Sequence, residues 1–132
     1  MLVLIRGLPG AGKSTLAKVM LARGEVSAHF EADMFFEHKG RYQFDPCRLG
    51  DAHEWCYRQT AAALRRGASV AVSNTFTQRW EMKRYIVAAK ALGVPVKVVR
   101  LAGTHGSIHN VPAASVERMA RRFEDYSGEE IL

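Results

Sequence analysis

The chain has 132 residues, of which 48% are hydrophobic, and this is enough for one domain with a hydrophobic core. Nineteen basic and thirteen acidic residues give a net charge of +6, which favours an anionic partner such as nucleic acid. No apolar stretch approaches the roughly 20 residues of a membrane span. Its two cysteines, Cys47 and Cys56, form neither a disulfide framework nor a metal-binding spacing. We therefore expect one domain over residues 1–132, with no membrane association, in the cytoplasm or inside a host cell.

Residues 7–14 read GLPGAGKS and match the phosphate-binding loop pattern G-x-x-x-x-G-K-[ST]. The apolar run at residues 2–5 predicts a buried strand before the loop, and apolar residues at helical spacing predict a helix after it. In this setting, backbone N–H groups and the helix N-terminus bind phosphate. The pattern predicts a nucleoside triphosphate site in which Lys13 contacts the β- and γ-phosphates and Ser14 holds Mg²⁺. The expected nucleotide contacts are Leu8, Pro9, Gly10, Ala11, Gly12, Lys13, Ser14 and Thr15.

A carboxylate follows the second predicted strand. Residues 28–32 predict a short strand that ends at Asp33. Open α/β sheets bind ligands at the carboxyl ends of their strands, so Asp33 is expected to lie next to the phosphate loop. In phosphoryl transfer to an alcohol, an aspartate accepts the hydroxyl proton, which makes Asp33 the candidate catalytic base. The alternative is that Asp33 caps the following helix.

The segment that follows is rich in aromatic residues and cations. Residues 34–46 contain Phe35, Phe36, Tyr42 and Phe44 among His38, Lys39 and Arg41. Rings beside cations are typical of surfaces that stack bases and contact phosphates. The alternative is that Phe35 and Phe36 belong to the core. An amphipathic helix is predicted over residues 49–66.

The third predicted strand, residues 69–73, ends without an acidic residue. Many phosphate-loop enzymes place an aspartate there that organises Mg²⁺. Asn74 and Thr75 follow the strand instead and are candidate substrate contacts. A helix is predicted over residues 77–92, capped by its first residue. Arg79 in its first turn opposes the helix dipole, which makes it a further candidate substrate contact beside the alternative of an ordinary surface arginine.

Residues 96–101 predict a fourth strand, residues 102–112 a loop, and residues 130–132 the stub of a fifth strand. Between the loop and the stub, a helix is predicted from Ala113. Its expected buried residues are Val116, Met119, Ala120 and Phe123, and its other face carries Arg118, Arg121 and Arg122. Exposed arginines are usually solvated, but in phosphoryl-transfer enzymes a loop–helix lid brings arginine to the transferred phosphate. Arg118 and Arg122 are therefore candidate catalytic residues.

Several stretches, taken in order, resemble the small phosphate-loop kinases related to phage polynucleotide kinase. They are the loop at residues 7–14, Asp33, and residues 42–46 (YQFDP), 52–56 (AHEWC), 73–77 (SNTFT), 80–81 (WE) and 108–112 (IHNVP). The resemblance covers nearly the whole chain. It implies an α/β three-layer P-loop NTPase fold, with a parallel sheet of order 2-3-1-4-5 between helices. It also implies ATP- and Mg²⁺-dependent phosphorylation of a hydroxyl on nucleic acid, with DNA favoured over RNA.

Two departures from that family bear on the acceptor. In the end-labelling kinases an arginine that grips the substrate phosphate follows the catalytic aspartate by three residues, and Phe36 stands there in this chain. Those kinases also carry arginines in the lid loop, where this chain has residues 107–110 (SIHN). The departures favour a kinase that holds a base, as the phage kinases of 5-hydroxymethyluracil in DNA do, with Phe36 stacking on it. A kinase of 5′-hydroxyl ends, a small-molecule kinase for a nucleoside or antibiotic, and a nucleotide-binding regulatory module stay open as alternatives.

Overall fold

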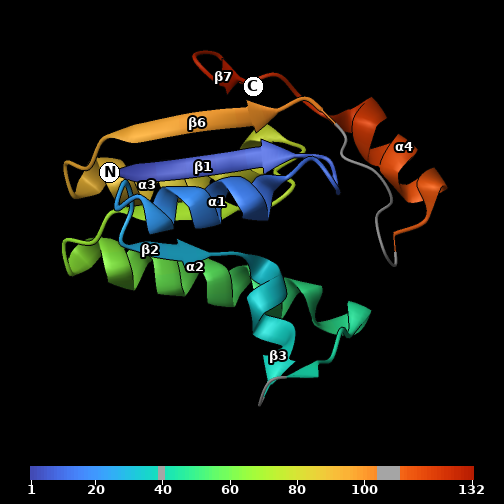
Figure 1. The fold of residues 1–132 in the computed structure, drawn as a ribbon, viewed down its shortest axis with the longest axis horizontal. Helices are drawn as coiled ribbons and strands as arrows, with labels where there is room; N and C mark the ends of the chain where they lie inside the picture. The colour runs from blue at the N-terminus through green and yellow to red at the C-terminus, as the bar shows by residue number, and fades with distance from the viewer. Residues whose placement is uncertain (39–40, 104–110) are drawn as a thin grey trace.

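The computed structural model describes residues 1–38, 41–103 and 111–132, and its centre is a five-stranded parallel sheet (Figure 1). The sheet order is β2-β5-β1-β6-β7. Counted along the chain within this sheet alone, that is the order 2-3-1-4-5, so the predicted topology is confirmed. The strands are β1 (Leu2–Gly7), β2 (Ala28–Phe30), β5 (Val70–Ser73), β6 (Val96–Leu101) and β7 (Glu130–Ile131).

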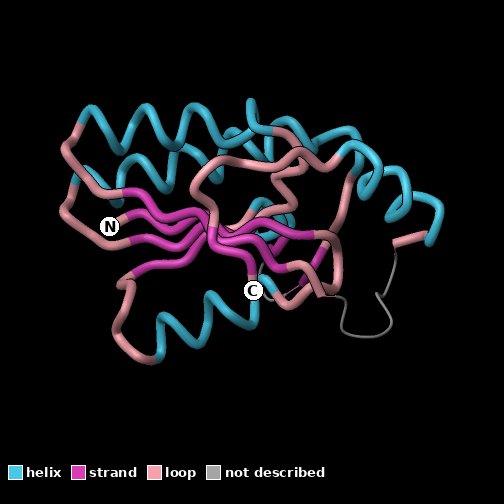
Figure 2. The backbone as a smooth tube through the Cα atoms, turned by 90° about the horizontal axis from the view of Figure 1, so that it is seen from above, coloured by secondary structure: helices cyan, strands magenta, loops and turns pink. Residues whose placement is uncertain are grey.

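Helices cover both faces of the sheet (Figure 2). Helix α1 packs on one face, and α2 and α3 pack on the other. Their bounds, with that of α4, are Lys13–Ala22 (α1), Leu49–Arg65 (α2), Arg79–Ala91 (α3) and Ala113–Arg122 (α4). The fold is therefore the three-layer P-loop NTPase arrangement expected from the sequence.

The central strand β1 is buried along its whole length because helices cover both of its faces. Val3 and Ile5 join the core beneath α1, and Leu2 and Leu4 join the core beneath α2 and α3. This double burial explains why the strand reads as an apolar run rather than as an alternating pattern. The end of β1 places the phosphate loop at the carboxyl edge of the sheet.

Strand β2 is shorter than predicted and ends at Phe30. The backbone N–H of Ala32 donates to the Asn74 side chain at 2.9 Å instead of continuing a strand ladder. A 3₁₀ helix, η1 (Ala32–Phe36), begins here, so Asp33 lies in a helical turn and not directly at a strand end. Beyond it, the short hairpin of β3 (Glu37–His38) and β4 (Arg41–Tyr42) and a second 3₁₀ helix, η2 (Pro46–Arg48), lead into α2.

The predicted cap of α3 is wrong by one residue. The helix begins after Gln78, whose backbone N–H donates to the Glu81 carboxylate at 2.9 Å. The Thr77 hydroxyl also donates to Glu81, so it supports this carboxylate rather than capping the helix itself. The carboxylate of Glu81 thus stabilises the first turn of α3.

Helix α4 lies beyond the carboxyl edge of the sheet (Figure 1). We predicted that α4 buries an apolar face, but no residue of the helix is fully buried. Val116 and Met119 are half-buried, Ala120 is exposed, and Phe123 just after the helix is half-buried. Among the described residues of α4, the half-buried ones lie on one side of the helix. Residues 104–110, which form most of the predicted loop before α4, lie outside the described residues.

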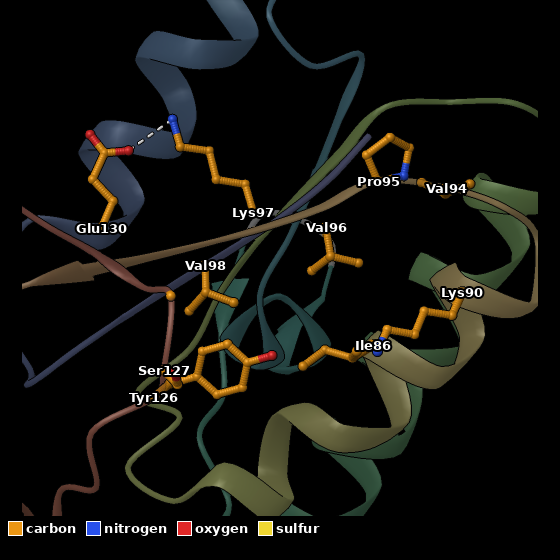
Figure 3. Close-up of a pocket in the computed structure, with 11 residues that line it drawn as sticks. Ile86, Lys90, Val94, Pro95, Val96, Lys97, Val98, Tyr126, Ser127 and Glu130 are labelled. Atoms are coloured by element: carbon orange, nitrogen blue, oxygen red, sulfur yellow. Dashed lines mark ion pairs between the residues drawn. The ribbon is translucent and has the colours of Figure 1, made fainter.

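A pocket of about 550 Å³ opens between α3 and the β6–β7 edge (Figure 3). Ile86, Val96, Val98 and Tyr126 line it, and Lys97 forms an ion pair with Glu130 beside it. The pocket begins at the amino end of β6, whereas the phosphate loop follows the carboxyl end of β1. It is therefore separate from the candidate site. No helix in the described ranges is long and apolar enough to cross a membrane.

Candidate active site

The phosphate loop connects β1 to α1 in the predicted place. Gly10 and Gly12 have φ angles of 84° and 92°, a region that residues with side chains rarely adopt, so the curl of the loop depends on glycine at both positions. The Ala11 N–H donates to the Leu8 carbonyl at 3.1 Å, which closes the turn. The curled backbone precedes the N-terminus of α1, the arrangement that binds anions.

Gly7, the first residue of the motif, is required for a different reason, which is the close approach of a neighbouring strand. It pairs with Leu101 of the neighbouring strand β6. A β-carbon built on Gly7 would lie 2.9 Å from the Leu101 carbonyl oxygen, closer than a real β-carbon comes to another atom. The two central strands therefore approach each other closely where the loop begins.

Lys13 folds back over the loop, and its Nζ donates to the Leu8 carbonyl at 3.0 Å. Burial lowers the pKa of Lys13 to about 8, and the neighbouring carboxylates Glu31 and Asp33 oppose this shift. Both carboxylates therefore lie near enough to interact with the ammonium group. A phosphate bound in the loop would add negative charge beside Lys13 and favour its charged form.

A hydrogen-bond network joins Ser14 to the ends of two strands. The Oε2 atom of Glu31 accepts from Ser14 Oγ at 2.6 Å and from Ser73 Oγ at 3.0 Å. Ser73 Oγ also lies 2.8 Å from His29 Nε2. Because the Ser73 hydroxyl donates to Glu31, its oxygen accepts the proton on His29 Nε2. Burial lowers the pKa of His29, which favours the neutral ring with its proton on Nε2.

Sequence reasoning missed Glu31 because it assigned this residue to the interior of a strand. The signal that identifies it is positional. Glu31 follows β2 and Ser73 ends β5, and these neighbouring parallel strands bring both residues to the sheet edge that holds the phosphate loop. The donor set of Ser14 and Glu31 fits Mg²⁺ bound to a nucleotide, which proteins commonly hold through one or two carboxylates together with phosphates and water. That mode needs no group of three or more acidic, His or Cys ligands, and the described part of the chain contains none.

Asp33 is exposed in the first turn of η1, and its Oδ1 accepts from the Tyr42 hydroxyl at 3.2 Å. Burial and the Asp33 carboxylate raise the pKa of Tyr42 to about 12. The alternative that Asp33 caps a helix is wrong, because Glu31 holds the cap position of η1 and Asp33 lies inside it. Its carboxylate remains accessible for proton transfer.

Phe36 is 4% exposed and belongs to the core, so the prediction that it stacks on a base is wrong. The rings of Phe35 and Phe44 lie edge-on to it, with centroids 5.5 and 5.1 Å away. The 3₁₀ turn of η1 directs Phe36 inward, into the core. Tyr42 and Phe44 are exposed instead, and their rings are stacked nearly parallel.

Asn74 is buried, and both ends of its amide are used within the fold. Its Oδ1 accepts from the Ala32 N–H, and its Nδ2 points toward Cys56 Sγ at 3.7 Å. Asn74 therefore holds the start of η1 in place, and a substrate contact by this residue stays a prediction. Thr75 is half-buried beside the loop, where its carbonyl accepts from the Gly7 N–H at 3.2 Å.

Three arginines were predicted to contact the substrate or its phosphate, and none of their described contacts is with Asp33. The backbone N–H and the guanidinium of Arg79 both donate to Glu124, at 2.9 and 3.3 Å. Arg118 and Arg122 are exposed on α4, and Arg118 donates to Ser115 in the preceding turn. The structure thus ties Arg79 to the C-terminal segment, and a phosphate contact by Arg118 or Arg122 stays a prediction.

A pocket of about 700 Å³ lies between the first turns of α2 and α3. His53, Tyr57, Trp80 and Arg84 are among its lining residues. Burial lowers the pKa of His53, and the charge of Asp33 is among the effects that oppose this shift. His53, a lining residue of this pocket, therefore lies near enough to Asp33 for the carboxylate charge to act on its ring.

Comparison with known proteins agrees with this geometry. Residues 2–105 match a family model described as an AAA domain. The chain belongs to this AAA domain family. Its members have a P-loop kinase fold, and nucleotide binding by the loop follows from that membership. The matched residues include the loop, Glu31, Asp33 and the pocket between α2 and α3.

The AAA domain is similar to human NEDD4-binding protein 2, with 40% identity over 90 residues. The alignment covers 67% of this chain and 5% of that protein, so the chain spans a small part of its relative's length. Solved structures share the fold at low identity. One is Kti12 of Chaetomium thermophilum with ADP-AlF3, with a TM-score of 0.67 and 15% identity over 100% of this chain and 88% of that one. Another is a gluconokinase of Sinorhizobium meliloti 1021, with a TM-score of 0.66 and 16% identity over 98% of this chain and 80% of that one. The Pnkp1/Rnl/Hen1 RNA repair complex also contains this fold, with a TM-score of 0.70 and 15% identity over 92% of this chain and 43% of that one.

A buried arginine of this AAA domain, Arg6, also escaped sequence reasoning. Its guanidinium donates to the Phe76 carbonyl at 2.7 Å and to the Glu129 carboxylate at 2.9 Å. The ring of Phe123 lies between Arg6 and Arg100, 4.4 and 4.5 Å from their Cζ atoms. Arg6 therefore attaches the segment after α4 to the end of β1, directly before the phosphate loop.

Proposed function

We propose that this AAA domain is an ATP-dependent kinase that transfers the γ-phosphate of ATP to a hydroxyl group carried on nucleic acid. The observation that carries the proposal is the place of Asp33. Its charge acts on Lys13 in the phosphate loop and on His53, which lines the 700 Å³ pocket. An exposed carboxylate whose charge acts both on the phosphate-binding loop and on a pocket residue is our candidate to receive the proton of an acceptor hydroxyl.

Each residue of the site has a separate role in the reaction. The loop N–H groups and Lys13 hold the β- and γ-phosphates, and Asp33 accepts the proton as the hydroxyl attacks in line. When bound at Ser14, Mg²⁺ supplies positive charge that offsets the charge on the phosphates. Positioning and electrostatic stabilisation account for most of the rate enhancement in phosphoryl transfer, so a rigid loop and a fixed carboxylate suffice.

The lining of the pocket supports a nucleic-acid acceptor. Trp80 is 70% exposed, and the guanidinium of Arg84 lies over the Tyr57 ring, with its Cζ 4.4 Å from the centroid. Aromatic rings beside cations stack bases and attract phosphates. The net charge of +6 adds attraction for a polyanion. These features favour a polymer over a small neutral sugar.

Within nucleic acid, the burial of Phe36 changes the balance between two acceptors. A hydroxymethylated base such as 5-hydroxymethyluracil must leave the duplex stack to reach Asp33, at a cost of a few kcal/mol that stacking in the enzyme offsets. The core position of Phe36 weakens the case for a base stacked at that residue, and Tyr42 is the exposed alternative. A 5′-hydroxyl end needs no extrusion. We therefore favour a 5′-hydroxyl end of DNA as the acceptor.

The test offers ATP labelled at the γ-phosphate together with four acceptors in parallel. They are a 5′-hydroxyl DNA oligonucleotide, the matching RNA, a 5′-phosphorylated duplex with internal 5-hydroxymethyluracil, and free nucleosides. We expect label on the 5′-hydroxyl DNA, and no label with the Asp33→Asn variant. Label on the internal base alone would identify a base kinase. Label on nucleosides alone, or on none of the four, would overturn the nucleic-acid proposal.

A further inference from the structure

We infer that Glu31 supplies the carboxylate of the magnesium site, in place of the aspartate that many phosphate-loop enzymes have at the end of the strand corresponding to β5. The inference rests on the proposed function, because it assumes that the loop binds a nucleotide with Mg²⁺. Strand β5 ends here at Ser73, whose hydroxyl carries no charge. The missing charge is provided from the neighbouring strand.

The strand register explains how this is possible. Phe30 of β2 pairs with Val72 of β5 in parallel, so Glu31 and Ser73 follow at the same level of the sheet. From there the carboxylate of Glu31 reaches Ser14 Oγ at 2.6 Å, and its same oxygen accepts from Ser73 Oγ. Ser14 is the residue whose hydroxyl ligates Mg²⁺ in phosphate-loop proteins. The Glu31 carboxylate therefore lies beside the position of the metal ion.

The choice of side chains at the two positions is complementary. Adjacent strands lie about 4.8 Å apart, so a carboxylate that starts from β2 must reach farther than one that starts from β5. Glutamate has the extra methylene group for this. Serine at position 73 leaves room for the carboxylate and donates a hydrogen bond to it, whereas an aspartate there would bring two negative charges into contact.

Glu31 and Asp33 then have separate tasks. Glu31 is half-buried against Ser14 and Ser73, whereas Asp33 is exposed and bonded to Tyr42. A metal ligand belongs next to the loop serine, and a proton acceptor belongs at an exposed position that a substrate can reach. The positions of the two carboxylates match these tasks in that order.

The test measures the affinity of a fluorescent ATP analogue with excess Mg²⁺ and with EDTA, for the wild type and Glu31→Gln. With EDTA, Glu31→Gln should bind the nucleotide at least as tightly as the wild type, because a carboxylate that repels the phosphates is gone. With Mg²⁺, the gain in affinity that the metal gives should fall by about 10- to 100-fold, the range seen when groups that hold a metal or its ligands are removed. Mn²⁺ binding to the nucleotide complex, followed by electron paramagnetic resonance, should weaken in parallel.

A second variant returns the carboxylate to β5. Glu31→Ser combined with Ser73→Asp should recover much of the Mg²⁺-dependent affinity that Glu31→Ser alone loses. Glu25→Gln removes the same charge from an exposed position after α1 and should behave as the wild type. Thermal melting without ligand shows whether each variant is folded.

Three results would count against the inference. An unchanged Mg²⁺ dependence in Glu31→Gln would overturn it. An equal loss of affinity with and without Mg²⁺ would also overturn it, since it would show that Glu31 only supports the loop. Failure of the wild type to bind the nucleotide at all would overturn the proposed function itself and the inference with it.

Discussion

The guanidinium of Arg6 donates to the carboxylate of Glu129 at 2.9 Å, across 123 positions of the chain. Their side chains are 0% and 5% exposed. Arg6 lies one residue before the end of β1, and Glu129 directly precedes β7. This ion pair therefore joins the C-terminal segment to the central strand at the base of the candidate site.

Replacing Arg6 by methionine should lower the free energy of unfolding by about 3–5 kcal/mol, because it removes the fully buried partner of the Glu129 carboxylate and leaves only the longer contact with Arg100, at 3.5 Å. Denaturant unfolding measures the change. Arg100→Met is the matched control, since Arg100 also contacts Phe123 and Glu129 but is 24% exposed. An equal loss in both variants would show that burial of the pair does not set its contribution.

Lys13→Ala should abolish phosphoryl transfer and greatly weaken nucleotide binding while the fold stays intact. The reason is that the ammonium is the only side-chain cation that the loop motif itself brings to the β- and γ-phosphates. Nucleotide titration and circular dichroism measure the two properties. A folded Lys13→Ala protein with normal turnover would contradict the assignment of the loop.

Asp33→Asn should lower kcat by about 10²- to 10⁴-fold, the usual contribution of a general base, and leave the nucleotide Kd unchanged. Tyr42→Phe removes the hydrogen bond to Asp33 but keeps the carboxylate, so its effect on kcat should be much smaller. Steady-state kinetics and nucleotide titration separate the two. If Asp33→Asn also lost nucleotide binding, its role would be in the loop and not in proton transfer.

Phe36→Ala should lower stability, whereas Trp80→Ala should lower oligonucleotide binding. Phe36 is buried, so its truncation should cost about 3–5 kcal/mol of stability. Trp80 is exposed in the pocket lining, so its truncation should leave stability within about 0.5 kcal/mol and cost about 1–3 kcal/mol of oligonucleotide binding. Thermal unfolding and fluorescence anisotropy measure these. A stable Phe36→Ala protein with impaired binding would restore Phe36 as a substrate contact.

Binding of single-stranded DNA should weaken as salt rises, with a log–log slope of about −0.7 for each phosphate neutralised. Arg118→Gln and Arg122→Gln should each make the slope shallower if α4 contacts the substrate. Arg65→Gln, exposed at the last turn of α2, removes the same charge and should leave the slope unchanged. A slope near zero in the wild type would indicate a small uncharged acceptor.

The parts of the fold that depend on local pattern could be predicted from the sequence. The phosphate loop, its flanking strand and helix and the strand β6 follow from glycine positions and apolar runs. The position of Phe36 could not be predicted in this way, because two adjacent phenylalanines point in different directions and only the η1 turn decides which one is buried.

The positions of the Glu31 carboxylate and of the buried arginine depend on distant contacts. Glu31 could not be recognised because β2 ends two residues before the predicted end, where the Ala32 N–H donates to Asn74, the residue directly after β5. Arg6 follows an apolar run, and nothing near it in the sequence indicates that Glu129 will neutralise it. The amphipathic period of α4 shows which face is apolar, but the depth of burial depends on what the helix meets at the end of the sheet.

The close approach of Gly7 to Leu101 separates two kinds of information within one sequence motif. Gly10 and Gly12 are required by the backbone angles of the loop, and a phosphate is the reason for those angles. Gly7 is required by the spacing of β1 and β6, because any side chain there would push the two strands apart before a ligand arrived. The first glycine of G-x-x-x-x-G-K-[ST] is thus required by the packing of the sheet. A variant at Gly7 would tilt the loop away from its nucleotide, although the residues that contact the phosphates would all be unchanged in the sequence.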